Sequence, residues 1–147
     1  EGVEFTKIYS PFSTTMKWLS NIPLTLMFGL EDLSFKSETV IITKSFKDLQ
    51  LLSSIHSDVC STQNESEASF LEENQKFLLS KYKKAVIFWD NDNTGKENCK
   101  KFNEKGFGYF NTPRQDYEKY SITDPSDFVK AYSLDLLKEE FKKKNLL

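Results

Sequence analysis

The apolar positions of this chain follow two periods that alternate along the sequence. Apolar runs at residues 40–42, 59–60 and 85–89 are short and are rich in β-branched or aromatic side chains. Such runs are typical of strands that are buried on both faces of a sheet. Residues 107–110 predict a further strand of the same kind.

Helical spacing separates these strands. After the first strand, apolar side chains recur at the spacing of one helix face: Phe46, Leu49, Leu52 and Ile55. Longer helices are predicted over residues 67–82 and 94–105, and Gly106 ends the second of them. Two helices close the chain, one opened by Asp124 with a proline in its first turn and one capped by Ser133.

Strands that alternate with helices of this length predict an α/β fold, with a mainly parallel central sheet covered by helices on both faces. A short β-containing segment precedes it, beginning with a strand at residues 5–11. The 147 residues are the size of one ordinary domain. We therefore predict an N-terminal segment over residues 1–36 and an α/β domain over residues 37–147.

Charge and cysteine content narrow the class of protein. The net charge of −2 gives no general attraction to nucleic acid, so any polyanion must bind at a local site. Cys60 and Cys99 match no zinc-binding spacing, and a reducing cytoplasmic compartment is the simplest interpretation. No apolar run reaches the length of a membrane span, so no membrane association is expected. The chain begins without methionine and is expected to be part of something longer.

The main candidate chemistry lies in the loop after the third apolar run, which reads FWDNDNTG. Alternate side chains of an extended backbone share a side, so Asp90 and Asp92 are able to reach one cation. Mg²⁺ favours one or two carboxylates completed by water and phosphate oxygens. The plain alternative is a solvated acidic turn that caps the next helix.

Two other motifs share part of this string. An EF-hand loop needs a glutamate at its twelfth position, where this chain has Lys101, and it should follow a helix. Haloacid-dehalogenase phosphotransferases use the first aspartate of a similar motif as nucleophile. That motif normally stands at the start of a domain, and only residues 96–147 follow it here. We therefore reject the EF-hand and disfavour the phosphotransferase.

Three sequence blocks in order give a more specific match: VIITKSFKD at residues 40–48, FWDNDNTG at 88–95 and TDPSDF at 123–128. Together they resemble the Toprim domain of phage-type DNA primases and primase-helicases. In that family, acidic residues follow successive strands in this order. The strings KIYSPF, KWLSN and MFGLEDL resemble, more weakly, the end of the RNA polymerase subdomain that precedes the Toprim domain in these primases.

The resemblance implies roles for particular residues. The catalytic residues that it implies are Lys44, Asp48, Asp90 and Asp92. The ligands that it implies for Mg²⁺ or Mn²⁺ are Asp90, Asp92 and Asp124. Contacts to nucleic acid are implied for Lys44 and Lys96.

The resemblance also implies a reaction and partners. The expected activity is nucleotidyl transfer for primer synthesis in DNA replication, with a DNA template and nucleoside triphosphates as substrates. A replicative helicase is a possible partner, and the expected location is the cytoplasm, that of the host cell if a phage encodes the protein. Alternatives are a metal-dependent Toprim nuclease, or a Toprim module that binds nucleic acid or a partner without catalysis.

The chain departs from the family at the end of the first strand. Lys44 stands where the family has glutamate, and Ser45 stands where it has glycine. An ammonium group cannot ligate Mg²⁺, so either catalysis is lost or Lys44 holds a phosphate oxygen while another acid fills in. Glu65 and Glu67 are candidates for that acid, although acids at a helix start are the plainer interpretation.

Several other residues leave two interpretations open. Asp48 lies four residues after Lys44 on one helix face, where it either orients the lysine or forms an exposed ion pair. Asp127 is a weaker alternative to Asp124 as the third acid. His56 is predicted to lie on the surface, and Trp18 and Trp89 are predicted to pack. The basic cluster before the third strand predicts a solvated helix end, with nucleic-acid contact as the alternative: Lys81, Lys83 and Lys84.

Overall fold

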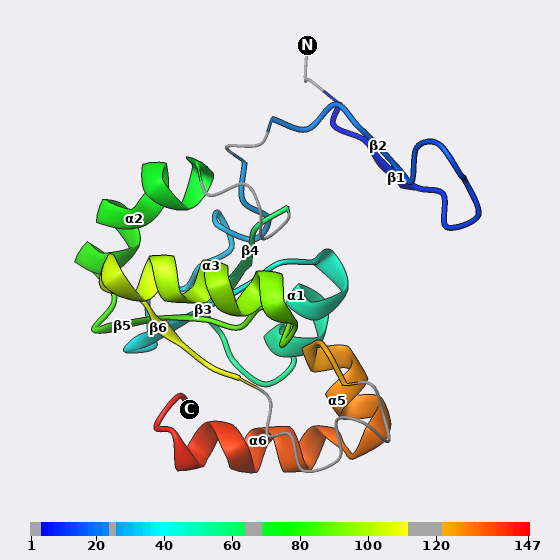
Figure 1. Ribbon diagram of the computed structural model, residues 1–147. Helices are drawn as coiled ribbons and strands as arrows, with labels where there is room; N and C mark the ends of the chain where they lie inside the picture. Colours follow the sequence, from blue (N-terminus) through cyan, green and yellow to red (C-terminus); the bar gives the residue numbers. More distant parts are fainter. Residues whose placement is uncertain (1–3, 24–25, 64–68, 112–121) are drawn as a thin grey trace.

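A computed structural model describes residues 4–23, 26–63, 69–111 and 122–147 and confirms the α/β fold (Figure 1). Its strands are β1 (Lys7–Tyr9), β2 (Trp18–Ser20), β3 (Thr39–Thr43), β4 (Val59–Ser61), β5 (Lys84–Ile87) and β6 (Gly108–Tyr109). Its helices are α1 (Phe46–Ser53), α2 (Ser69–Lys81), α3 (Asn93–Glu104), α5 (Pro125–Ala131) and α6 (Leu134–Lys143).

The main sheet has four strands in the order β4-β3-β5-β6, and every pair is parallel. After β3, the chain adds β4 on one side of that strand, and then returns to add β5 and β6 on its other side. The strand order therefore reverses between β3 and β5. In open α/β sheets, ligands bind at such a reversal, in the crevice outside the carboxyl ends of the strands.

Two hydrophobic cores cover the two faces of this sheet. One core contains side chains from or next to α2 and α3: Leu78, Tyr82, Cys99, Phe102 and Phe107. The other contains side chains from α1, α5 and α6: Leu49, Leu52, Phe128, Leu137 and Phe141. The central strand β3 supplies both, because Val40 and Ile42 join the first core and Ile41 joins the second. All five β3 residues are buried, as its unbroken apolar run predicts.

The helix boundaries follow local signals that the sequence displays. Asp124 caps α5 by accepting a hydrogen bond from the backbone of Asp127 at 2.8 Å, and Ser133 caps α6. Gly106 follows α3 with φ of 94°, a conformation that side chains with a Cβ rarely adopt. These three predicted helix ends are confirmed.

Two predictions from the first helix and the loop after it are wrong. Phe46 was expected on the buried face, but it is the first residue of α1 and is 56% exposed, with its ring edge against Phe28. His56 was expected on the surface, but it is buried, and its Nε2 hydrogen-bonds the carbonyl oxygen of Thr39 at 2.8 Å. The loop after α1 thus packs under the start of β3.

The N-terminal segment has two parts. Strands β1 and β2 form an antiparallel hairpin that projects from the α/β body (Figure 1). The following residues belong to the body itself, since Met27 and Leu33 are buried in its core and Phe28 forms a bridge with Ser61. The division after residue 36 remains a prediction, and these contacts join residues 26–36 to the α/β core.

Asp58 fastens the end of that segment to the sheet. Its buried carboxylate accepts hydrogen bonds from the backbone of Ser34 at 2.5 Å, Phe35 at 3.0 Å and Ser37 at 2.9 Å. Burial raises the pKa of Asp58, but these hydrogen bonds outweigh burial and leave the pKa below its ordinary value. Asp58 therefore holds the chain in place immediately before β3.

In the part of the chain that the structure describes, none of the helices combines the length and the apolar character that crossing a membrane requires.

Candidate functional site

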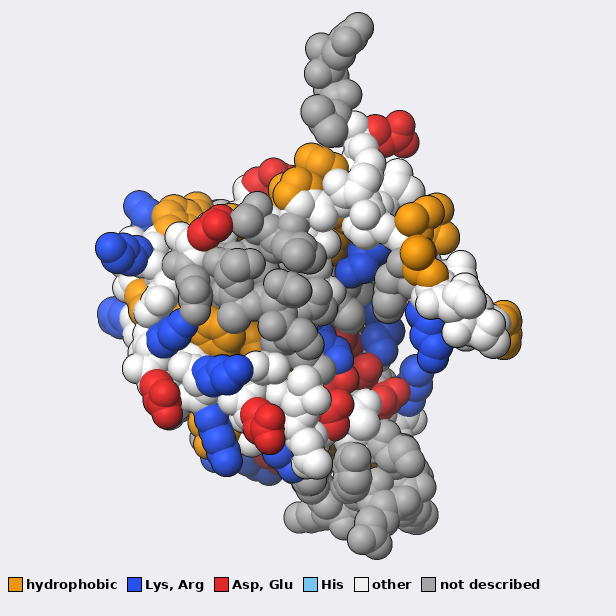
Figure 2. Space-filling model, turned by 45° about the horizontal axis from the view of Figure 1, so that its top comes forward, with side chains coloured by type: hydrophobic (Ala, Val, Ile, Leu, Met, Phe, Trp, Pro, Cys, Tyr) orange, Lys and Arg blue, Asp and Glu red, His pale blue; other side chains and the backbone are white. Residues whose placement is uncertain are grey.

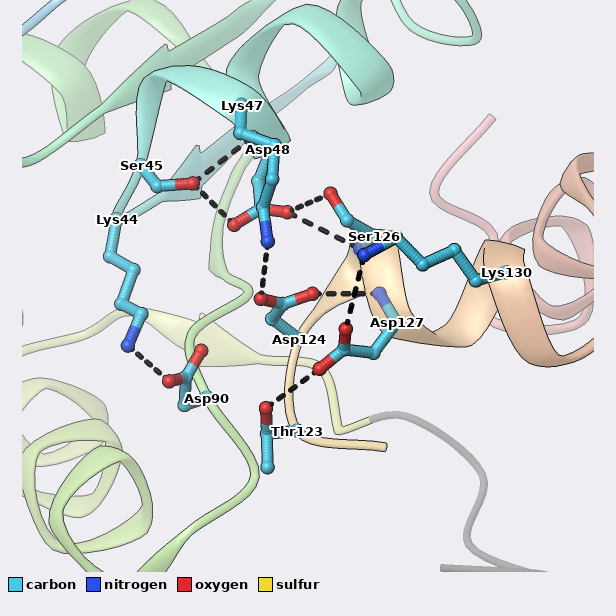
Figure 3. A network of polar contacts seen from close by, with 10 residues as sticks. All are labelled: Lys44, Ser45, Lys47, Asp48, Asp90, Thr123, Asp124, Ser126, Asp127 and Lys130. Atoms are coloured by element: carbon cyan, nitrogen blue, oxygen red, sulfur yellow. Dashed lines mark hydrogen bonds and ion pairs between the residues drawn. The ribbon is translucent and has the colours of Figure 1, made fainter. Parts of the chain in front are cut away.

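The predicted site residues lie at the carboxyl edge of the sheet, where the strand order reverses. The loop after β3 carries Lys44, and the loop after β5 carries Asp90 and Asp92. Strands β3 and β5 are direct neighbours in the sheet. This adjacency brings together residues that are 46 positions apart in the sequence, and the Lys44 ammonium contacts the Asp90 carboxylate (Figure 3).

The Lys44–Asp90 ion pair is largely shielded from solvent. The side chains of Lys44 and Asp90 are 22% and 15% exposed. Lys44 contacts Oδ2 of Asp90, whereas the buried Oδ1 finds no hydrogen-bond partner among the described residues. Burial raises the pKa of Asp90, Lys44 opposes that effect, and the charges of Asp124 and Asp92 reinforce it, so that the pKa stays above its ordinary value.

Asp92 is the N-cap of α3. Its Oδ1 accepts a hydrogen bond from the backbone of Gly95 at 2.8 Å. Capping leaves the second carboxylate oxygen of Asp92 for another ligand, because a carboxylate accepts through both oxygens. The acidic turn that caps the next helix is therefore present, and it coexists with the buried ion pair at Asp90.

Asp124 reaches the same edge from the far end of the chain. Its Oδ1 caps α5, and its Oδ2 accepts a hydrogen bond from Lys47 Nζ at 2.7 Å. The Lys47 side chain is 53% exposed and the Asp124 side chain is 14% exposed. The loop holding Asp90 is tied to this segment, since the backbone of Asn91 donates to the carbonyl of Thr123 at 2.7 Å.

Asp48 points into the contact between α1 and α5. Its fully buried carboxylate accepts hydrogen bonds from the hydroxyls of Ser45 at 2.5 Å and Ser126 at 2.6 Å, and from the backbone of Ser126 at 3.3 Å (Figure 3). The interpretation that Asp48 forms an exposed ion pair is therefore wrong. Asp48 joins α5 to the loop that carries Lys44, and its catalytic role stays a prediction.

The remaining candidates lie at different distances from this edge. Lys96 lies in the first turn of α3, four residues after Asp92, and its role in binding nucleic acid stays a prediction. The basic cluster is at the opposite edge, where β5 begins; Lys83 pairs with Glu38, and Lys84 donates to the carbonyl of Asn145. The alternative acids at residues 65 and 67 lie outside the described residues.

The arrangement at Asp90 suits a divalent cation that is held by one or two carboxylates, and does not form a cage of several carboxylates around a cation. Within residues 4–23, 26–63, 69–111 and 122–147, no three His, Cys, Asp or Glu side chains form a group that could hold a metal ion. Mg²⁺ needs only one or two protein carboxylates when phosphates and water complete its shell. The unpartnered Oδ1 of Asp90 is an acceptor of that kind, and Lys44 competes for the other oxygen.

Sequence reasoning missed Lys47 and Ser126. Each lies within a motif that the sequence displays, one position before Asp48 and two positions after Asp124. Their partners are 77 and 78 residues away, so no local spacing reveals these contacts. A lysine at the start of a predicted helix, where helix dipoles disfavour cations, was the available signal for Lys47.

No protein-family model matches the chain, and no curated protein matches it with significant similarity. The Toprim resemblance therefore rests on the three sequence blocks, while the α/β fold and the strand-end placement of two of these blocks are properties of the structure itself.

Proposed function

We propose that this chain is the Toprim domain of a phage-type DNA primase, and that its Lys44–Asp90 edge binds nucleotide phosphates together with a divalent cation. The observation that carries the proposal is Asp90. It is a largely shielded carboxylate at the reversal of strand order, with one oxygen on Lys44 and the other, which is buried, without a partner among the described residues. Among the described residues, buried polar atoms of Thr43, Tyr82 and Trp89 also lack a partner, and Asp90 supplies the one carboxylate oxygen in this group. Functional sites are a recognised place for such atoms.

Each charged side chain of the edge has a distinct task in this proposal. Lys44 and Lys47 are the donors for phosphate oxygens, because both ammonium groups lie at this edge and retain partial exposure. Asp90 and Asp92 are the cation ligands, with Asp124 next to them. A bound Mg²⁺ would supply Lewis-acid stabilisation of charge on the phosphate oxygens.

The scaffold supports phosphate binding at this edge. Helices α1 and α3 begin immediately after Ser45 and Asp92, so the positive ends of their dipoles lie at the same rim as the lysines. The Asp48–Ser126 hydrogen bond fixes the start of α5 against α1. The resemblance adds the reaction, which is primer synthesis on a DNA template, and the location, which is the cytoplasm, that of the host if a phage encodes the protein.

A second candidate is a Toprim module that binds nucleic acid or a replication partner without catalysis. One observation favours it. Lys44, which stands where the family carries a glutamate, places its ammonium group directly on the Asp90 carboxylate. A site neutralised in this way would hold a phosphate through its lysines, without a cation. The two candidates differ in metal dependence, since only the first needs a cation at Asp90.

Calorimetric titration with ATP, in the presence and absence of Mg²⁺, tests the proposal. We expect Mg²⁺-dependent binding that weakens about tenfold or more in Asp90→Asn, because a charged ligand oxygen is lost. Asp135→Asn is the matched control, since its carboxylate is 89% exposed on α6. Binding that is equal with and without Mg²⁺ supports the non-catalytic module. Binding that Asp90→Asn leaves unchanged contradicts the proposal.

A further inference from the structure

The β1–β2 hairpin presents an unusual surface. Only two strands form it, and such a hairpin is marginally stable alone. Its exposed large side chains are Phe5 (44%), Ile8 (48%), Tyr9 (53%), Phe12 (96%), Met16 (60%) and Leu19 (59%). Ile8 and Leu19 lie opposite each other on one face of the hairpin and Tyr9 points to the other face, so both faces expose apolar side chains. Several exposed apolar side chains on one small element mark an interaction site more often than singly scattered ones do.

The chemistry of the hairpin combines aromatic rings with cations. Phe5, Tyr9 and Phe12 are exposed rings within eight residues, and the same hairpin carries the exposed Lys17 and Lys7, whose ammonium group is bound to a carbonyl oxygen of the α/β body. Aromatic faces that stack on bases, next to lysines that follow the backbone, are the usual means of binding single-stranded nucleic acid. The hairpin matches a ligand that has both flat apolar faces and negative charge.

The base of the hairpin is connected to the candidate site. Lys7 Nζ donates to the carbonyl of Gln63 at 3.0 Å, immediately after the carboxyl end of β4. The neighbouring Thr62 donates through its backbone to the carbonyl of Thr43 at 2.8 Å, and Thr43 precedes Lys44. The hairpin therefore rises from the same edge of the sheet that carries the Lys44–Asp90 pair.

The space-filling view agrees with this placement. Figure 2 shows hydrophobic side chains along the projecting hairpin, beside a hollow in which acidic and basic side chains lie next to one another. A strand lying against the hairpin would thus have its backbone close to the charged edge.

We propose that the hairpin binds single-stranded DNA by stacking bases on Phe12 and its aromatic neighbours, and leads the strand to the Lys44–Asp90 edge. The second half of this statement rests on the proposed function of that edge. DNA is the favoured polymer because the proposed function of the edge takes a DNA template.

Fluorescence anisotropy with a labelled single-stranded DNA of about 20 nucleotides tests the stacking. Phe12→Ala should weaken binding about fivefold or more, the loss typical of one stacked base. Phe12→Leu should lose most of the same affinity, because it keeps an apolar side chain and removes the ring face. Phe77→Ala, which removes an exposed ring from α2, is the control and should bind like the unaltered protein.

Three results would overturn the inference. The first is unchanged DNA binding in Phe12→Ala, which is expected to fold normally because the ring is 96% exposed. The second is full binding in Phe12→Leu, which would show apolar contact without stacking. The third is self-association that Phe12→Ala abolishes while DNA binding is absent, which would make the hairpin a contact between copies of this chain.

The same assay separates this inference from the proposed function. Phe12→Ala should keep Mg²⁺-dependent ATP binding while it loses DNA binding, and Asp90→Asn should lose Mg²⁺-dependent ATP binding. If Phe12→Ala leaves DNA binding intact and Asp90→Asn still loses ATP, only the hairpin inference fails. If Phe12→Ala loses DNA and Asp90→Asn keeps ATP, only the proposed function of the edge fails.

Discussion

Replacing Lys44 with methionine is expected to tighten the binding of free Mn²⁺ by about tenfold or more. The Lys44 ammonium contacts Oδ2 of Asp90 and so competes with any cation for that carboxylate. Removing a unit positive charge about 5 Å from a divalent cation is worth about 2 kcal/mol at the dielectric constant of water and about 7 kcal/mol at an effective dielectric constant of about 20, so tenfold is the lower end of the expected gain. Methionine keeps most of the side-chain volume, so the surrounding packing should persist.

The same substitution should have the opposite effect on nucleotide. Lys44→Met should weaken Mg²⁺–ATP binding, because a donor to the phosphate oxygens is lost. Lys83→Met is the matched control, since Lys83 is 73% exposed and pairs with Glu38 at the opposite edge of the sheet. Titrations with each ligand measure the two affinities. If Lys44→Met leaves Mn²⁺ affinity unchanged or lowers it, Lys44 does not compete for the cation site.

Replacing Asp48 with alanine is expected to lower the free energy of unfolding by about 3 kcal/mol or more. The fully buried carboxylate of Asp48 accepts three hydrogen bonds that link Ser45 on the Lys44 loop to Ser126 on α5. Hydrogen bonds to a charged group contribute about 1.5–3 kcal/mol each, and the substitution leaves the serine hydroxyls without their acceptor. Urea denaturation followed by circular dichroism measures the loss.

A control for Asp48 is available on α6. Asp135 is also at a helix start, but its side chain is 89% exposed and its only ion pair in the described part of the chain is with Lys138. Asp135→Ala should change stability by less than about 0.5 kcal/mol. Should Asp48→Ala unfold at the same urea concentration as Asp135→Ala, the buried network would not hold α5 in place.

The fold was predictable because its signals are local. The unbroken apolar run of β3 reports burial on both faces, and this holds because the two cores meet at that strand. Asp124, Ser133 and Gly106 mark helix ends through short-range backbone geometry. The predicted strand over residues 107–110 is shorter in the structure, where β6 covers Gly108–Tyr109.

The candidate site was predictable only in part, because strand order assembles it. Sequence reasoning placed Asp90 and Lys44 at strand ends, but nothing local shows that β3 and β5 are neighbours. It predicted that Asp48 either orients Lys44 at the site or forms an exposed ion pair. In the structure, tertiary contact with Ser126 buries Asp48 between two helices. The prediction that His56 lies on the surface was wrong for the same reason, since its hydrogen-bond partner Thr39 is 17 positions away.

The central claim is that the edge between β3 and β5 holds a divalent cation at Asp90. Titration of isotope-labelled protein with substoichiometric Mn²⁺ tests it most directly, because a bound paramagnetic ion broadens nearby amide signals. We predict selective loss of the signals of residues 90–93, 44–46 and 123–125, and no such loss in Asp90→Asn. Broadening that Asp90→Asn leaves unchanged, or that is spread evenly over exposed carboxylates such as Asp135, would contradict the claim.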